Sequence, residues 1–155
     1  MQRKSALVLI VVLALCALAF GADNNVGTWK LNIAKSKYSP GPPPKSQTLK
    51  IEAWGTDGVK YVADGVGPDD KPTHSEFQAK YDGKDYPFIG NPDADRLSYK
   101  RIDANTLEAT TTLKGKNTTA FKVVVSADGK TRTVTQTGTN AQGQALNVSS
   151  VYERQ

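Results

Sequence analysis

The feature that most constrains the fold is an alternation of apolar and polar residues with a period of two. In the first clear run, Leu49, Ile51 and Ala53 fall on one face, while Lys50 and Glu52 fall on the other. This is the pattern of a half-buried β-strand, because successive side chains of a strand point to opposite faces. The alternation recurs four more times, at Val59/Tyr61/Ala63, Ser75/Phe77/Ala79/Tyr81, Leu97/Tyr99/Arg101 and Leu107/Ala109/Thr111/Leu113. We therefore expect an all-β fold.

Short turn sequences separate the expected strands, as in Asp57-Gly58, Asp82-Gly83 and Asp128-Gly129. Aspartate tolerates the left-handed backbone conformation that tight turns need, and glycine adopts it freely. Strands joined this tightly are antiparallel neighbours. Three longer connections are rich in Pro, Gly, Asp or Ser and are expected to be loops, at 35–46, 65–72 and 86–95.

About eight to ten such strands are expected, and a meander of that many short strands must close or leave exposed edges. Closure favours an antiparallel up-and-down β-barrel, with a β-sandwich as the alternative. Residues 22–155 are enough for one core and contain no obvious linker, so we expect a single domain. The whole chain has only four Phe, two Trp and one Met. Small side chains on the strands would leave a cavity inside a barrel of this size.

The first 21 residues have the features of a cleavable secretory signal peptide. Arg3 and Lys4 precede an apolar run at 6–20, and small residues precede the expected cleavage site after Gly21 or Ala22. The run has 15 residues, whereas a transmembrane helix needs about 20, which argues against a membrane anchor. Lipidation of Cys16 is the other alternative, but a leucine precedes this cysteine where a small residue is wanted. We expect a secreted or periplasmic protein with no membrane span after cleavage.

The sequence gives little indication of nucleic-acid binding, metal binding or catalysis. The formal net charge of +5 falls to +3 without the leader, and the remaining Lys and Arg are scattered among acids, so we expect no nucleic-acid partner. Cys16 is the only cysteine and lies in the leader. His74 is the only histidine, and its neighbours Ser75 and Glu76 would point to alternate faces of a strand, so they do not form a catalytic triad. We expect no catalytic residues, no metal site and no cofactor.

Two short motifs at the ends of the mature chain, GTWKL at 27–31 and VYER at 151–154, resemble those of the calycin superfamily. The Gly-x-Trp is similar to the lipocalin signature, and the two motifs together resemble the fatty-acid-binding branch. The resemblance implies a β-barrel whose closed end is plugged by Trp29, with Arg154 lying across the indole as its basic partner. By alternation, Leu31 and Ile33 are expected to face inward with Trp29.

The chain departs from the fatty-acid-binding pattern in three ways. The segment 35–46 is short and rich in proline where that branch has a lid of two helices. The last strand reads Ser150-x-Tyr152 where that branch has an Arg-x-Tyr clamp for a carboxylate, and the leader contrasts with a cytosolic location. Arg132, in phase with Val134, is one candidate to replace the missing arginine. The candidate ligand-binding residues are Tyr99, Arg101, Lys122, Arg132 and Tyr152.

The leading hypothesis is an exported, non-enzymatic binding protein that holds a small hydrophobic or amphipathic molecule inside the barrel. The alternative is a secreted structural or protein-interaction β-domain without a pocket, acting through its surface. A cavity of several hundred Å³ lined by Tyr and apolar side chains would favour the first hypothesis. The pattern carries no signal for the oligomeric state.

Overall fold

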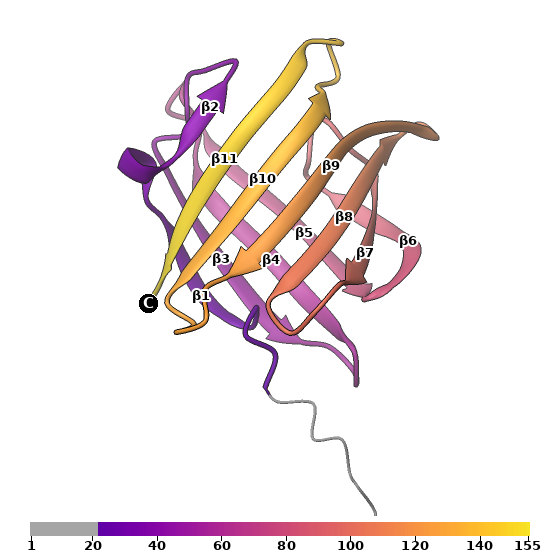
Figure 1. Ribbon diagram of the computed structural model, residues 1–155. Helices are drawn as coiled ribbons and strands as arrows, with labels where there is room; N and C mark the ends of the chain where they lie inside the picture. Colours follow the sequence, from indigo (N-terminus) through magenta and orange to yellow (C-terminus); the bar gives the residue numbers. More distant parts are fainter. Residues whose placement is uncertain (1–21) are drawn as a thin grey trace, which may run out of the picture.

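The computed structural model describes residues 22–155, which form one continuous antiparallel β-sheet rolled into a barrel (Figure 1). The signal peptide expected at 1–21 lies outside the described residues. The elements are, in chain order, β1 (Gly27–Leu31), the 3₁₀ turn η1 (Ile33–Lys35), β2 (Lys37–Ser39), β3 (Ser46–Ala53), β4 (Gly58–Val66), β5 (Pro72–Lys80), β6 (Asp82–Ile89), β7 (Arg96–Arg101), β8 (Thr106–Leu113), β9 (Lys116–Val125), β10 (Thr131–Thr139) and β11 (Ala145–Arg154).

The barrel is a ring in which consecutive strands pair from β3 to β11 and β1 joins the two ends. β1 pairs with β3 on one side, where Trp29 lies opposite Leu49. On the other side it pairs with β11, where Trp29 lies opposite Arg154. Ten strands therefore close the ring, and β2 is an eleventh strand attached to β11. This confirms the predicted all-β barrel and its strand number.

β1 and β2 lie one after the other along the same edge of β11. β1 pairs with the end of β11 near Tyr152, and β2 pairs with an earlier part near Val148. Between them, η1 turns the chain, and Ile33 is 37% exposed. The expectation that Ile33 faces inward is therefore wrong, because the strand alternation ends at Leu31. The expected loop at 35–46 contains β2, since backbone pairing with β11 is available before the first proline.

The expected loop at 86–95 also needs correction, because β6 runs on to Ile89. This strand is only loosely attached to β5. Backbone pairing between the two is limited to Glu76 with Ile89 and Phe77 with Phe88, whereas β6 pairs with β7 along more of its length. Pro87 lacks the N–H that a full ladder would need. The proline thus weakens the strand on one side without preventing it from forming.

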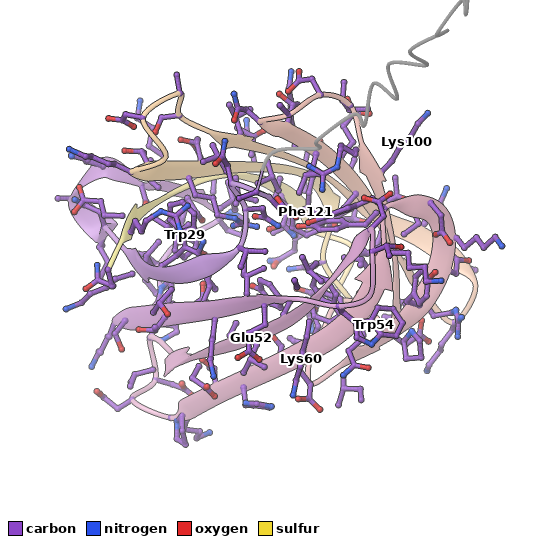
Figure 2. The ribbon with its side chains drawn as sticks, turned by 90° about the horizontal axis from the view of Figure 1, so that it is seen from below. Trp29, Glu52, Trp54, Lys60, Lys100 and Phe121 are labelled. Carbon is purple, nitrogen blue, oxygen red and sulfur yellow. The ribbon has the colours of Figure 1, made fainter. Side chains whose placement is uncertain are left out.

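Alternation places one face of every strand inside the barrel, where the core lies. Trp29, Leu49 and Val59 are completely buried, and Ile51 is nearly so. These side chains come from β1, β3 and β4 and belong to the packed core. Trp29 lies opposite Arg154 near the C-terminus, at the lower end of the barrel in Figure 1, where the described chain also begins. Figure 2 looks into this end from below, with Trp29 near β1 and Phe121 within the ring of strands. In residues 22–155, no helix is long and apolar enough to cross a membrane.

Candidate ligand-binding site

A cavity of about 350 Å³ occupies the barrel interior above the packed core. Its wall consists of inward-facing side chains from β2 to β11, with Val134 and Gln136 following Arg132 along β10. Its mouth is bordered by Pro40 and Pro44 and by the loop between β6 and β7. The cavity expected from the small strand residues is present.

The loop between β6 and β7 reaches across the mouth of the cavity. Asn91, Pro92 and Asp93 in this loop line the cavity. The Asp93 carboxylate accepts a hydrogen bond of 2.8 Å from the Ala141 N–H, in the turn between β10 and β11. This contact joins two loops that are far apart in sequence, so it restricts the opening through which a molecule would pass.

Arg132 provides the positive charge at the lower end of the cavity. Its residue is only 2% exposed. Nε donates to Asn25 Oδ1 at 2.9 Å, Nη2 donates to the Tyr99 hydroxyl at a long 3.5 Å, and the guanidinium lies 5.8 Å from the centre of the Tyr152 ring. No carboxylate of the described residues forms an ion pair with it. Arg132 is thus a buried cation held by neutral groups.

The Arg132 guanidinium also has N–H groups that could donate hydrogen bonds to a molecule in the cavity. A guanidinium has five N–H donors, but Arg132 makes only two hydrogen bonds to described residues, and neither involves Nη1. Across residues 22–155, no buried side-chain nitrogen or oxygen lacks a hydrogen-bond partner. Nη1 must therefore be accessible from the cavity that Arg132 lines.

The phenols around Arg132 are neutral at physiological pH. Burial raises the pKa of Tyr61 to about 12, although the positive charge of Arg132 acts in the opposite direction. Burial is also the main cause that raises the pKa of Tyr99 and of Tyr152, again against the effect of Arg132. No tyrosinate is therefore present to balance the buried guanidinium. The lower end of the cavity keeps a net positive charge.

Two further hydrogen bonds organise the polar groups of the wall. The Tyr152 hydroxyl donates to Gln47 Oε1 at 2.6 Å, and the Tyr38 and Ser150 hydroxyls lie 2.9 Å apart. All four side chains line the cavity. Because these groups already have partners within the wall, Arg132 remains the strongest free donor.

Trp29 and Arg154 close the lower end of the barrel. The Arg154 guanidinium lies 4.2 Å from the centre of the Trp29 ring. It donates three hydrogen bonds to backbone carbonyls, to Gly129 at 2.6 Å, Val26 at 2.8 Å and Asn24 at 2.7 Å. The structure thus brings together the two residues assigned to closure, and neither lines the interior cavity.

Arg101, a candidate ligand contact in the sequence, lies outside the interior cavity. Its side chain is over the Tyr81 ring at 4.3 Å and pairs with Asp23 at 3.2 Å. These residues line a surface groove of about 910 Å³ beyond the closed end. Arg101 shares the inward phase of Tyr99, but it is the last residue of β7 and lies past the core that seals the barrel.

Lys122 also lies away from the cavity. It is exposed on β9 between Phe121 and Val123, both of which line the cavity. Alternation therefore directs Lys122 to the outer surface. Of the five candidate ligand residues, the structure brings together Tyr99, Arg132 and Tyr152 at the cavity and separates Arg101 and Lys122 from it.

Several cavity residues were not singled out from the sequence. Tyr61 stands in the alternating run Val59/Tyr61/Ala63, so the period-two signal could have identified it. Phe121 alternates with Val123 and Val125 on β9, a signal of the same kind. Asn25 could not be identified in this way, because it precedes β1 in an irregular segment. It is 3% exposed, accepts the hydrogen bond from Arg132 and donates to the Tyr81 hydroxyl at 3.3 Å. Asn25 thus joins the Arg132 site to the closed end.

The arrangement has no evident catalytic apparatus in the described part of the chain. His74 lies on the outer face and contacts Asp64 at 2.7 Å, away from the cavity. No group of three or more His, Cys, Asp and Glu side chains among residues 22–155 is placed to hold a metal ion. The site offers apolar walls, neutral hydroxyls and one buried cation, which suits non-covalent binding.

Neither a protein-family model nor a curated protein matches the chain. Among solved structures, the chain is similar to wild-type fluorescent protein UnaG, with 18% identity, a TM-score of 0.54, and coverage of 84% of this chain and 96% of that one. It is also similar to zebrafish ileal bile acid-binding protein complexed with cholic acid, with 14% identity, a TM-score of 0.50, and coverage of 85% and 99%. Both similarities extend over the barrel. The chain therefore has a calycin-like fold, a closed antiparallel β-barrel of ten strands.

Proposed function

We propose that this is an exported, non-enzymatic binding protein that holds a small hydrophobic or amphipathic molecule in the barrel interior. An anionic or strongly polar group of the ligand binds Arg132, and the apolar part lies between the walls above it. The zebrafish neighbour was solved in complex with cholic acid, and binding of a small amphipathic molecule is the part of this likeness that we propose for the present chain.

The observation that carries the proposal is the unpaired burial of Arg132. Taking a guanidinium out of water costs several kcal/mol unless an opposite charge compensates it. In this barrel its partners are an amide oxygen and a phenol, and its remaining donors face an open cavity. A ligand anion would supply the missing charge. Ligand binding would then offset the desolvation free energy of Arg132 in the ligand-free protein.

The distribution of side chains supports one orientation of the ligand. Arg132, Tyr61, Tyr99 and Tyr152 surround the lower end, whereas prolines border the mouth. A molecule that enters with its polar group first would place that group on the guanidinium. Burial of its apolar part would contribute about 25 cal/mol for each Å² removed from water.

A titration with matched variants tests the proposal. The protein is unfolded and refolded to remove bound molecules, and the compact anionic fluorescent probe 1-anilinonaphthalene-8-sulfonate is titrated into the wild type, Arg132→Met and Lys122→Met. Both variants lose one positive charge, but Lys122 is exposed on the outer face. We expect the Arg132 variant to bind the anionic probe more than about tenfold more weakly, a loss of about 1.4 kcal/mol, and the Lys122 variant to bind as the wild type does.

Two outcomes would count against the proposal. If the probe does not bind and native mass spectrometry of the purified protein finds no retained molecule, the cavity is not a ligand site. The alternative surface-acting β-domain would then be preferred. If the two variants weaken binding equally, the guanidinium in the cavity has no specific role and binding reflects overall charge.

Export is supported by the leader at 1–21 and leads to a direct test. We expect the protein recovered from outside the cytoplasm to begin just after Gly21. This cleavage would leave Asp23 in place, which accepts hydrogen bonds from the Tyr81 hydroxyl at 2.7 Å and from Arg101 at 3.2 Å. N-terminal sequencing checks the position, and an uncleaved chain in the cytoplasm would overturn the proposed localisation.

A further inference from the structure

Aromatic side chains form a large part of the cavity wall. The chain has four Phe, six Tyr and two Trp in total. Seven of them line the cavity, namely Tyr38, Tyr61, Phe77, Phe88, Tyr99, Phe121 and Tyr152. Aromatic residues of the barrel are thus concentrated around the space that a ligand would occupy.

One half of the barrel carries aromatic rings that pack against each other. Tyr61 on β4 is stacked on Phe77 on β5, with ring centres 4.6 Å apart and planes 10° apart. Phe77 also meets Phe88 on β6 and Tyr99 on β7 edge to face, at 5.3 and 5.5 Å. These contacts fix the rings as a rigid wall, because each ring is held by at least one neighbour.

The other half of the barrel carries aromatic rings without a ring partner. Tyr38 on β2, Phe121 on β9 and Tyr152 on β11 line the cavity, and none forms a ring–ring pair within residues 22–155. In the order of strands around the ring, β9 and β11 lie across from the half formed by β4 to β7. Figure 2 shows Phe121 pointing within the ring of strands. A flat ring in the cavity would therefore lie between two aromatic walls.

The volume of the cavity and the stiffness of its aromatic wall further limit the shape of the ligand. The cavity of about 350 Å³ is at the small end of the roughly 300–1,000 Å³ typical of ligand pockets. Aromatic side chains have only two rotatable bonds and adapt little to a ligand's shape. Aromatic pairs favour offset-stacked or edge-to-face arrangements with ring centres about 4.5–7 Å apart. A compact planar molecule meets these conditions, whereas a long flexible chain would lose conformational freedom to fit a short cavity.

Resting on the proposed function, we infer that the ligand is a compact aromatic acid, with its anionic group on Arg132 and its ring between the two aromatic walls. Phe121 contacts the ring from the β9 side. Phe77, held at the centre of the packed wall, faces it from the other. Long-chain fatty acids are disfavoured by the same geometry.

Two probes with equal numbers of non-hydrogen atoms test the inference. Both 2-naphthoate and undecanoate carry one carboxylate, but only the first is aromatic and planar. Isothermal titration of the ligand-free wild type is expected to show 2-naphthoate binding at least tenfold more tightly. Undecanoate binding equally or more tightly would overturn the aromatic assignment and leave the proposed function in place. If neither probe binds, the aromatic assignment fails, and if native mass spectrometry also finds no retained molecule in the purified protein, the proposed function fails with it.

A pair of variants on β9 provides the second measurement. Phe121→Leu removes a cavity ring, and Val124→Leu changes an apolar residue that is 39% exposed on the same strand. The preference for 2-naphthoate over undecanoate is expected to fall at least threefold in Phe121→Leu and to stay unchanged in Val124→Leu. An unchanged preference in Phe121→Leu would overturn the role of the aromatic walls. Comparing a ratio of two affinities within each variant separates this effect from any general loss of folded protein.

Discussion

Arg132 and Arg154 have contrasting environments, so the same substitution should lower the free energy of unfolding much more at Arg154 than at Arg132. Replacing Arg132 with Met relieves the desolvation of a buried cation, which is worth several kcal/mol. The change also removes its hydrogen bonds to Asn25 and Tyr99, at roughly 1–2 kcal/mol each. We expect a net effect between zero and a gain of about 2 kcal/mol, because hydrophobic replacement of buried ionic groups is often neutral or stabilising by about 1–4 kcal/mol.

Replacing Arg154 with Met should be destabilising. This arginine makes three hydrogen bonds to backbone carbonyls and lies over Trp29. The hydrogen bonds are worth about 1 kcal/mol each, and the cation over the indole adds about 0.5–2 kcal/mol. A loss of about 4 kcal/mol is a large part of a typical domain stability of roughly 5–15 kcal/mol.

Urea unfolding followed by far-UV circular dichroism measures both variants under the same conditions. The protein must first be refolded from denaturant, since a retained ligand would stabilise only the variant that binds it. We expect the free energies of unfolding of Arg132→Met and Arg154→Met to differ by at least about 3 kcal/mol, or a melting temperature difference of about 10 °C. If Arg132→Met loses as much stability as Arg154→Met, Arg132 is a structural residue. The reasoning that it is kept for a ligand would then fail.

Three other perturbations have definite expected outcomes. Gly27→Ala should destabilise the protein by more than about 1 kcal/mol, because Gly27 has φ +147° and a Cβ there would collide with Arg154; unchanged urea unfolding would contradict this. Leu49→Ala should cost about 2–5 kcal/mol, since Leu49 is completely buried, and a smaller loss in the same assay would show that the core collapses around the gap. The hydrogen bond to Asp64 raises the pKa of His74 above 6.5, so its NMR titration midpoint should fall towards 6.5 in Asp64→Asn. In the wild type, the contact between His74 and Asp64 contributes stability that is present below pH 6.5 and is lost as the pH rises through the raised pKa of His74. A midpoint that is the same in Asp64→Asn and in the wild type would show that the contact does not persist in solution.

Most of the barrel could be predicted because its signals are local. Most strands show their inward face by alternation, and several of the tight turns contain Asp, Asn or Gly. Alternation along the same strand also predicts that Arg132, Val134 and Gln136 face the same side, and the structure shows all three lining the cavity. Closure of the ring followed from the need to remove exposed edges.

The remaining features depend on contacts between distant segments. β2 is a strand because β11 offers it an edge, which its own proline-rich sequence does not reveal. Arg101 has the same phase as Tyr99, but the position of the packed core decides that one is outside the cavity and the other inside. Asn25 lies in an irregular segment, so only the folded structure shows that its side chain meets Arg132.

The double pairing of β1 also determines when the protein can fold. β1 is among the first parts of the barrel to be synthesised, yet one of its two edges can be covered only by the end of β11. Pairing of Trp29 with Arg154 must bring together nearly the full length of the domain, and such long-range contacts slow folding. A nascent chain that lacks its last strand is an open sheet with two free edges, which can pair with other chains. Removing the last few residues should therefore leave a barrel unable to close, and keeping the chain unfolded until its C-terminus is available would protect it from aggregation.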